Sequence, residues 1–158
     1  MRVFVGVGAN LGPARQMVRK TLQDLHGLPG TRLLRSSSLY LSAPVQASGP
    51  DYVNAVACLD TQLAAEDLWT HLQALEKLAG RQRPYARAPR TLDLDLLLYG
   101  DGQISNASLS VPHPRLHLRA FVILPLLEID PTLEVPGLGK ISLWRDRLDP
   151  AQVIRRLG

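Results

Sequence analysis

The sequence contains a single cysteine, few aromatic residues and no long hydrophobic run. Cys58 has no second cysteine to pair with, so disulfide bonds within the chain are excluded and a reducing compartment fits. No apolar run is long enough to cross a membrane, and Asn10 interrupts the N-terminal apolar stretch too early for the hydrophobic region of a signal peptide. We therefore expect a cytoplasmic protein without membrane association.

Several nucleotide- and metal-binding motifs are incomplete. Residues 6–12 hold three glycines, but the last lies one position too late for a dinucleotide-binding fingerprint. Residues 137–142 approach a P-loop and lack both its first glycine and the Ser or Thr directly after the lysine. His113 and His117 have the spacing of zinc ligands on a helix, but prolines flank His113 and no glutamate lies between the two. These gaps disfavour a dinucleotide fold, a P-loop enzyme and a zinc site.

The composition is that of a soluble globular protein. With 158 residues, 46% hydrophobic and 20% charged, the chain suits one domain spanning residues 1–158. The formal net charge of +4 and the isoelectric point near 9.6 favour an anionic ligand, although the excess of basic residues also fits a solvated surface. Charge alone does not choose between these alternatives.

Hydrophobic periodicity predicts a core with the element order β-α-β-β-α-β. Alternating apolar residues indicate the strands, and apolar residues at helical spacing indicate the helices. The expected elements are a strand at 3–7, a helix at Ala14–His26, strands at Thr31–Ser42 and Asp51–Thr61, a helix at Ala64–Ala79 and a strand containing Asp93 and Asp95. This order predicts an α+β, ferredoxin-like fold, with an antiparallel sheet that carries both helices on one face.

The remainder of the chain predicts C-terminal helices and a small hairpin. The expected elements are a short strand at Leu109–Val111, a helix at Ala120–Ile129, a short hairpin at Glu134–Leu143 and a final helix at Pro150–Leu157. The two core helices should each pack on the sheet through one apolar stripe. These stripes are Met17, Val18, Thr21, Leu22 and Leu25 in the first helix, and Leu68, Leu72, Leu75 and Leu78 in the second.

Two carboxylates, Asp93 and Asp95, lie inside an otherwise apolar stretch. In a strand, residues i and i+2 share a face and lie roughly 7 Å apart, so both Asp side chains point one way and Leu92, Leu94 and Leu96 point the other. Anions this close repel each other and resist burial unless a cation lies between them. Mg²⁺ fits, because it is bound by one or two carboxylates together with nucleotide phosphates. The alternative is an edge strand with two solvated aspartates.

The segment before this strand is rich in arginine, which favours a nucleotide site over a solvated strand face. Residues 80–90 contain four arginines, and the planar guanidinium group matches the geometry of phosphate oxygens. We expect residues 81–88 to order over a bound triphosphate as its charge is neutralised. His113, Arg115 and Arg119 form a second predicted phosphate-binding cluster, with a solvated basic turn as the alternative.

An RNA-binding module is the main alternative to an enzyme, because one common RNA-binding fold has the same element order. Such a module requires exposed aromatic residues on its central strands. Aromatic residues make up only 5% of this sequence, and two aspartates on a sheet face would repel a phosphate chain that carried no metal. We therefore expect no nucleic-acid partner.

The stretch Pro89-Arg-Thr-Leu-Asp-Leu-Asp-Leu-Leu-Leu-Tyr-Gly100 resembles the signature of the 6-hydroxymethyl-7,8-dihydropterin pyrophosphokinase family of folate biosynthesis. The similarity covers nearly the whole chain. Further matching segments, in the expected order, are Gly8–Asn10, Ser42–Pro44, Asp51–Asn54, Glu76, Arg81–Arg83, Val111–His113 and Arg119–Phe121. The sequence departs from the family pattern in the arginine-rich segment at residues 80–90, which we call the arginine loop. This loop is one residue shorter than in the family pattern and lacks the usual Trp. Ser108 and Pro114 stand where the family commonly has a basic and an aromatic residue.

This resemblance implies transfer of the β,γ-diphosphate of ATP to the hydroxymethyl group of a reduced pterin alcohol, with release of AMP. It also implies two Mg²⁺ ions, held by Asp93 and Asp95 and bridging the triphosphate of the co-substrate ATP. We expect the enzyme to be a monomer.

The resemblance assigns site residues to this chain as follows. The implied catalytic residues are Arg81, Arg83, Arg90, Asp93 and Asp95. The implied ATP-binding residues are Gln73, Glu76, Arg81, Arg83, Arg90, Leu96, Leu109, Ser110, His113 and Arg119. The implied pterin-binding residues are Gly8, Ser42, Ala43, Val45, Tyr52, Asn54, Asp93 and Phe121, with Tyr52 and Phe121 on the two sides of the flat ring.

Overall fold

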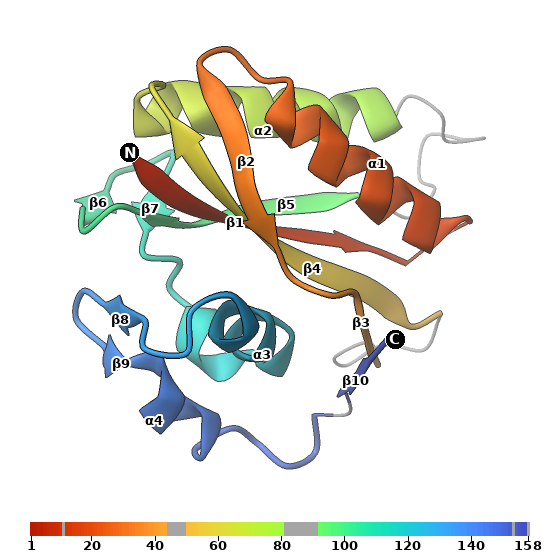
Figure 1. The fold of residues 1–158 in the computed structure, drawn as a ribbon, viewed down its shortest axis with the longest axis vertical. Coiled ribbons are helices and arrows are strands. Elements are labelled where there is room, and N and C mark those ends of the chain that lie inside the picture. The colour runs from red at the N-terminus through yellow and green to blue at the C-terminus, as the bar shows by residue number, and fades with distance from the viewer. Residues whose placement is uncertain (11, 44–49, 81–91, 153, 158) are drawn as a thin grey trace.

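The computed structural model describes residues 1–158 apart from 11, 44–49, 81–91, 153 and 158. Its centre is an antiparallel six-stranded sheet in the order β10-β3-β4-β1-β5, with β2 also paired to β4 (Figure 1). The strands are β1 (Arg2–Ala9), β2 (Thr31–Ser36), β3 (Tyr40–Ser42), β4 (Tyr52–Thr61), β5 (Asp93–Tyr99) and β10 (Ile154–Arg156). The predicted α+β class with an antiparallel sheet is confirmed.

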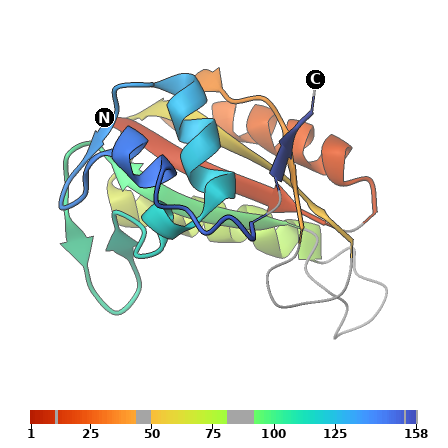
Figure 2. The ribbon, with the colours of Figure 1, turned by 90° about the horizontal axis from the view of Figure 1, so that it is seen from below.

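Helices lie on both sides of this sheet, as Figures 1 and 2 show. Helices α1 (Ala14–His26) and α2 (Ala65–Gly80) cover one face, and α3 (Ala120–Ile129) and α4 (Ile141–Arg145) lie on the other side. A single 3₁₀ turn, η1 (Leu116–Leu118), precedes α3. Two small ladders pair β6 (Ile104–Ser105) with β7 (Ser110–Val111), and β8 (Glu134–Val135) with β9 (Gly139–Lys140). Within the described ranges, no helix is both long enough and apolar enough to span a membrane.

The central strands β1 and β4 are buried on both faces because helices cover the sheet on both sides. Side chains that alternate along a strand therefore enter two separate hydrophobic clusters. The cluster beside α1 and α2 includes Val3, Val5, Val7, Ala55, Ala57 and Leu59, and the cluster beside α3 includes Phe4, Val56 and Cys58. Cys58 is thus a small core residue, and burial raises the pKa of its thiol.

Three of the predicted elements differ in the structure. The hairpin predicted at Glu134–Leu143 ends with β9 at Lys140, because helix α4 begins at Ile141. The strand predicted at Thr31–Ser42 is divided into β2 and β3, because Ser37 turns its hydroxyl to β4 and accepts a hydrogen bond of 2.9 Å from the Val56 N–H. The helix predicted at Pro150–Leu157 is wrong: Ile154–Arg156 forms strand β10 instead. Its backbone pairs with β3, and a sheet edge with unpaired N–H and C=O groups competes successfully with a short terminal helix.

The helical stripes were predicted correctly in α1 and only in part in α2. Leu68 and Leu72 are fully buried and Leu75 is partly buried, but Leu78 is 53% exposed. Each step of three residues falls about 60° short of a full helical turn, so two successive steps carry Leu78 away from the sheet. Ala79 takes the buried position at this end of α2.

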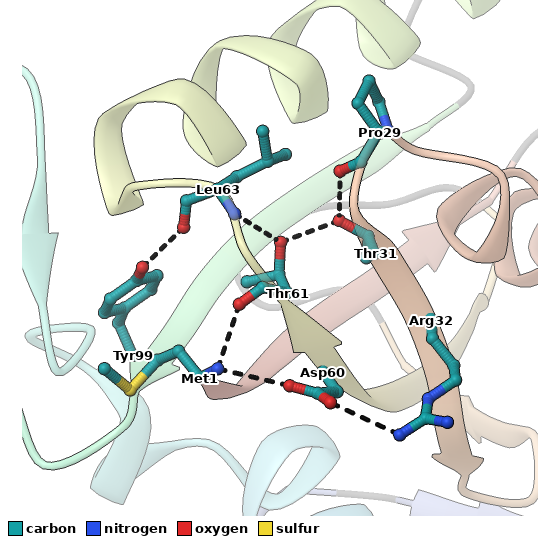
Figure 3. A network of polar contacts seen from close by, with 8 residues as sticks. All are labelled: Met1, Pro29, Thr31, Arg32, Asp60, Thr61, Leu63 and Tyr99. Carbon is teal, nitrogen blue, oxygen red and sulfur yellow. Dashed lines mark hydrogen bonds and ion pairs between the residues drawn. The ribbon is translucent and has the colours of Figure 1, made fainter.

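The first residue of the chain is tied into the sheet by polar contacts (Figure 3). The ammonium group of Met1 donates to Asp60 Oδ1 at 3.2 Å and to the Thr61 carbonyl at 3.0 Å. Arg32 Nη2 lies 3.4 Å from the other oxygen of Asp60, and Tyr99 donates from its hydroxyl to the Leu63 carbonyl. The hydrogen bond and charge of the N-terminus lower the pKa of Asp60. These contacts join β1, β2, β4 and β5 at one end of the strands. The site described below lies toward the other end.

Glu128 connects α3 to the edge of the sheet. Its carboxylate accepts hydrogen bonds from the Tyr40 hydroxyl at 2.7 Å and from the N–H and hydroxyl of Ser38, each at 2.9 Å. Arg156 of β10 lies 3.5 Å away. Burial alone would raise the pKa of Glu128, but these hydrogen bonds and the nearby charge lower it.

Glu128→Ala is expected to lower the free energy of unfolding at neutral pH by about 1 to 2 kcal/mol, since solvent screens part of this network. Because its pKa is lowered on folding, the stabilisation by Glu128 is present above the unfolded value near 4.5 and is lost as the pH falls through the lower folded value. Urea unfolding of the two proteins at pH 7 and pH 3 measures both effects. Glu134→Ala, an exposed control, should change neither, and a pH-independent difference for Glu128→Ala would contradict the prediction.

Candidate functional site

A cavity of about 740 Å³ lies between the sheet and the C-terminal part of the chain. This volume is within the range of small-molecule sites, about 300 to 1,000 Å³. The sheet contributes residues of β1, β4 and β5, among them Gly6, Gly8, Asn54, Asp93 and Asp95. The opposite wall comes from η1, the start of α3 and the segment after α4, among them Arg115, Arg119, Phe121, Arg147 and Gln152.

Two glycines of β1, Gly6 and Gly8, line this cavity and leave space where side chains would otherwise lie. Gly6 pairs with Asp95 of β5, and Gly8 pairs with Asp93 on one side and with Asn54 of β4 on the other. Paired residues of neighbouring strands point to the same face, so the missing side chains leave space between the aspartates and Asn54. A Cβ atom at Gly8 would lie 3.1 Å from Asn54 Oδ1, which is tighter than ordinary contact. Glycine at this position therefore keeps both the space and the Asn54 orientation.

Asp93 and Asp95 both line the cavity from the same face of β5. Asp93 is exposed and the side chain of Asp95 is 38% exposed, whereas Leu92, Leu94 and Leu96 are buried among α1 and α2, as the alternation predicts. The Glu76 carboxylate of α2 accepts a hydrogen bond of 2.8 Å from the Leu94 N–H. This contact ties α2 to β5 at the residue between the two aspartates.

Two basic side chains approach Asp95. His113 Nε2 lies 3.8 Å from Asp95 Oδ1, and Arg119 Nη1 lies 3.8 Å from Asp95 Oδ2. His113 is held against β5 through its backbone N–H, which donates to the Leu97 carbonyl at 3.0 Å. Burial lowers the pKa of His113, and the charge of Asp95 opposes this shift without cancelling it. Two members of the second predicted cluster, His113 and Arg119, thus lie beside Asp95, and the third, Arg115, lines the same cavity.

Two aromatic rings and a buried amide also line the cavity. Tyr52 of β4 and Phe121 of α3 are partly exposed, and the Arg119 guanidinium lies 5.5 Å from the centre of the Phe121 ring. Asn54 is 5% exposed and donates from Nδ2 to Ser42 Oγ at 2.7 Å, so its side-chain orientation is fixed by β3. Flat apolar groups and an oriented amide suit a planar ligand with a polar edge.

The donor set of this site fits Mg²⁺ better than a transition metal. Among the residues that the structure describes, no group of three or more His, Cys, Asp and Glu side chains could enclose a metal ion. Two carboxylates facing a cavity match a hard cation that takes oxygen ligands and completes its coordination with water and phosphate oxygens.

The described pterin-binding residues implied by the resemblance come together in the structure, whereas several of the implied ATP-binding residues do not line the same cavity. The described members of the first group all line the cavity: Gly8, Ser42, Ala43, Tyr52, Asn54, Asp93 and Phe121. Leu96 and Leu109 are buried in the core, and Gln73 and Ser110 are exposed elsewhere on the surface. The implied site residues outside the described ranges are Val45 and, in the arginine loop, Arg81, Arg83 and Arg90. The rest of residues 81–90 lies outside the described ranges as well.

Sequence reasoning missed the contribution of the C-terminal segment. Four residues of this segment line the cavity although no motif marks them: Arg147, Leu148, Asp149 and Gln152. Their position follows from the pairing of β10 with β3, which returns the end of the chain to the sheet. The only available signal was local, and it indicated a helix at Pro150–Leu157.

A single cavity lined by two carboxylates, an arginine and two aromatic rings fits a transferase that joins a metal-bound phosphate to a flat ring substrate. Comparisons with known proteins agree. The model of the family described as 7,8-dihydro-6-hydroxymethylpterin-pyrophosphokinase (HPPK) matches residues 4–131. The chain therefore belongs to the HPPK family.

Curated relatives match most of this chain. A 2-amino-4-hydroxy-6-hydroxymethyldihydropteridine pyrophosphokinase of Pseudomonas aeruginosa is 45% identical over 85% of this chain and 84% of its own length. The protein of the same name from Synechocystis sp. is 40% identical over 86% of this chain and 70% of its own. That of Methylorubrum extorquens is 34% identical over 98% of both chains.

Proposed function

We propose that this chain transfers the β,γ-diphosphate of ATP to the hydroxymethyl group of 6-hydroxymethyl-7,8-dihydropterin in folate biosynthesis and releases AMP. Membership in the HPPK family and the names of the relatives support this activity. The observation that carries it in the structure is one cavity that holds both the Asp93 and Asp95 pair and the Tyr52 and Phe121 rings. Such a cavity can hold a triphosphate and a flat alcohol in contact with each other.

The reaction forms one bond and breaks one. The hydroxymethyl oxygen bonds to the β-phosphorus of ATP, and the bond from that phosphorus to the oxygen shared with the α-phosphorus breaks, so AMP leaves. The proton of the hydroxyl group passes to solvent. Most of the catalysis of such a transfer comes from holding the reacting atoms in line and stabilising charge, so a dedicated general base is not required.

In this proposal, Asp93 and Asp95 hold two Mg²⁺ ions together with the triphosphate. Bound there, Mg²⁺ would neutralise phosphate charge and polarise the β-phosphorus. Arg119 and His113 lie next to Asp95, where they can bind phosphate oxygens and orient them against the carboxylates. The other proposed ATP-binding residues are those that the family resemblance implies: Arg81, Arg83, Arg90, Gln73, Glu76, Leu96, Leu109 and Ser110.

The pterin is proposed to lie between Tyr52 and Phe121, with its amide-like edge toward Asn54. The 2.7 Å hydrogen bond to Ser42 Oγ uses the Asn54 amide nitrogen, and this leaves Oδ1 on the side of Gly8 and the cavity floor. Gly8, Ala43, Val45 and Asp93 complete the proposed pterin contacts. An orientation fixed before binding reduces the entropy lost when the ring enters.

The proposal also includes a ferredoxin-like, single-domain monomer in the cytoplasm with no nucleic-acid partner. The strand order β3-β4-β1-β5, with α1 and α2 on one face, supports the ferredoxin-like assignment. The buried, unpaired Cys58 suits a reducing compartment.

The purified chain, incubated with ATP, Mg²⁺ and the pterin alcohol, is expected to produce AMP and pterin diphosphate in equal amounts. Chromatography of the nucleotides measures this, and omission of the pterin should stop AMP formation. Stoichiometric ADP would contradict the proposal, because it would show transfer of a single phosphoryl group.

A further inference from the structure

The side chain of Gln152 holds the peptide groups on both sides of Arg119. Its Oε1 accepts a hydrogen bond of 2.8 Å from the Ala120 N–H, and its Nε2 donates one of 2.9 Å to the Leu118 carbonyl. The orientation of the amide is unambiguous, because a peptide N–H can only donate and a carbonyl can only accept. Gln152 thus bonds to the residue before Arg119 and to the residue after it.

These two bonds fix the backbone at the junction between η1 and α3. Arg119 is the residue that precedes α3, with extended angles of φ −110° and ψ 115°, and its own side chain does not cap the helix. The first N–H groups of a helix lack partners within it, and the Ala120 N–H is the first of these in α3. Gln152 supplies that partner from a segment 32 residues further along the chain.

The two hydrogen bonds of Gln152, to the Leu118 carbonyl and the Ala120 N–H, form a clamp around Arg119. The C-terminal segment anchors this clamp. The Gln152 N–H donates to the Asp149 carbonyl at 3.1 Å, and Asp149 Oδ1 accepts from the Ala151 N–H at 2.9 Å. Beyond it, β10 pairs with β3. Before it, the rings of Trp144 in α4 and His117 in η1 meet edge to face at 4.8 Å. The segment around Arg119 is therefore held by the C-terminal region at two points.

We propose that Gln152 is a positioning residue for Arg119. By fixing the Leu118 carbonyl and the Ala120 N–H, it directs the Arg119 guanidinium into the cavity, 3.8 Å from Asp95 and 5.5 Å from the centre of the Phe121 ring. Gln152 lies beyond residue 131, where the match to the family model ends. The inference rests on the proposed function, in which Arg119 binds phosphate oxygens.

The test uses Gln152→Met, which keeps the length of the side chain and removes both strong hydrogen bonds. We expect kcat/KM for ATP to fall about tenfold, and most of this loss to disappear when the same change is made in an Arg119→Ala background, because the two residues then act as one unit. Hydrogen exchange at the Ala120 amide should accelerate in Gln152→Met. A tenfold loss that persists in full without the Arg119 guanidinium would overturn the proposal.

Arg156→Ala is the matched control for general loosening of the C-terminal segment. It removes the contacts of Arg156 with Ser38 and Glu128 and leaves the Gln152 bonds in place. It should lower the melting temperature without changing kcat/KM, and an equal loss of activity in both variants would show that Gln152 acts only through stability. If the wild-type chain formed no AMP, the proposed function would be wrong, and unchanged exchange at Ala120 in Gln152→Met would separately overturn the clamp.

Discussion

Asp95→Ala and Asp93→Ala are each expected to lower turnover in saturating Mg²⁺ and ATP by about a thousandfold, which corresponds to about 4 kcal/mol of lost transition-state stabilisation. Each change removes an oxygen ligand from the face of β5 that lines the cavity. The fold should survive, since Asp93 is exposed and Asp95 is partly exposed. Loss of one of two neighbouring anions removes their repulsion, and this offsets the loss of partly exposed contacts such as those of Asp95 with His113 and Arg119, so the melting temperature should change little.

Steady-state rates test the expected loss of turnover, and thermal melts test the expected effect on stability. Asp101→Ala is a suitable control, because Asp101 is an exposed carboxylate just after β5 and does not line the cavity. It should leave rate and Mg²⁺ dependence unchanged. Near-wild-type turnover in Asp93→Ala or Asp95→Ala would mean that the aspartates are only a polar face of the strand.

Arg119→Ala is expected to lower kcat by about a hundredfold, since it removes a preorganised donor aimed at the charge of the transferring group. Arg119 lies beside Asp95 and over the Phe121 ring, where it can contact the phosphate and still border the ring substrate. Arg119→Lys should recover only part of the loss, because a lysine ammonium cannot form the paired contacts of a guanidinium.

The control for this change in charge is Arg145→Ala in α4. Arg145 has a side chain that is 52% exposed and lies 3.8 Å from the carboxylate of its neighbour Asp146. Its removal should leave kcat and KM near wild type. A loss in Arg119→Ala no larger than that in Arg145→Ala would assign Arg119 to a solvated basic turn, which the sequence left open.

The sequence predicted the core because its signals are local. Alternation along residues 92–96 placed Asp93 and Asp95 on one face and three leucines on the other, and the structure agrees. The stripe of α1 was likewise predictable from helical spacing. What periodicity could not show was the second layer, in which α3 covers the face of the sheet opposite to α1 and α2.

The C-terminal part of the wall opposite to the sheet could not be predicted, because it depends on contacts between distant parts of the chain. Gln152 meets Leu118 and Ala120 because the pairing of β10 with β3 returns the end of the chain to the sheet. A strand of three residues carries too little periodicity to reveal that pairing. For Leu96 and Leu109, the proposed ATP contacts come from the family resemblance alone, and their side chains are buried in the core.

The most direct test of the central claim follows the two phosphorus atoms of ATP separately. Parallel reactions with the pterin alcohol and Mg²⁺ would use ATP labelled at the β-phosphorus in one tube and at the γ-phosphorus in the other. We predict that both labels appear in the pterin product in equal yield and that the AMP formed carries neither, because the β,γ-diphosphate moves as one unit. A pterin product that contains only the γ label, with the β label retained in ADP, would contradict diphosphate transfer by this chain.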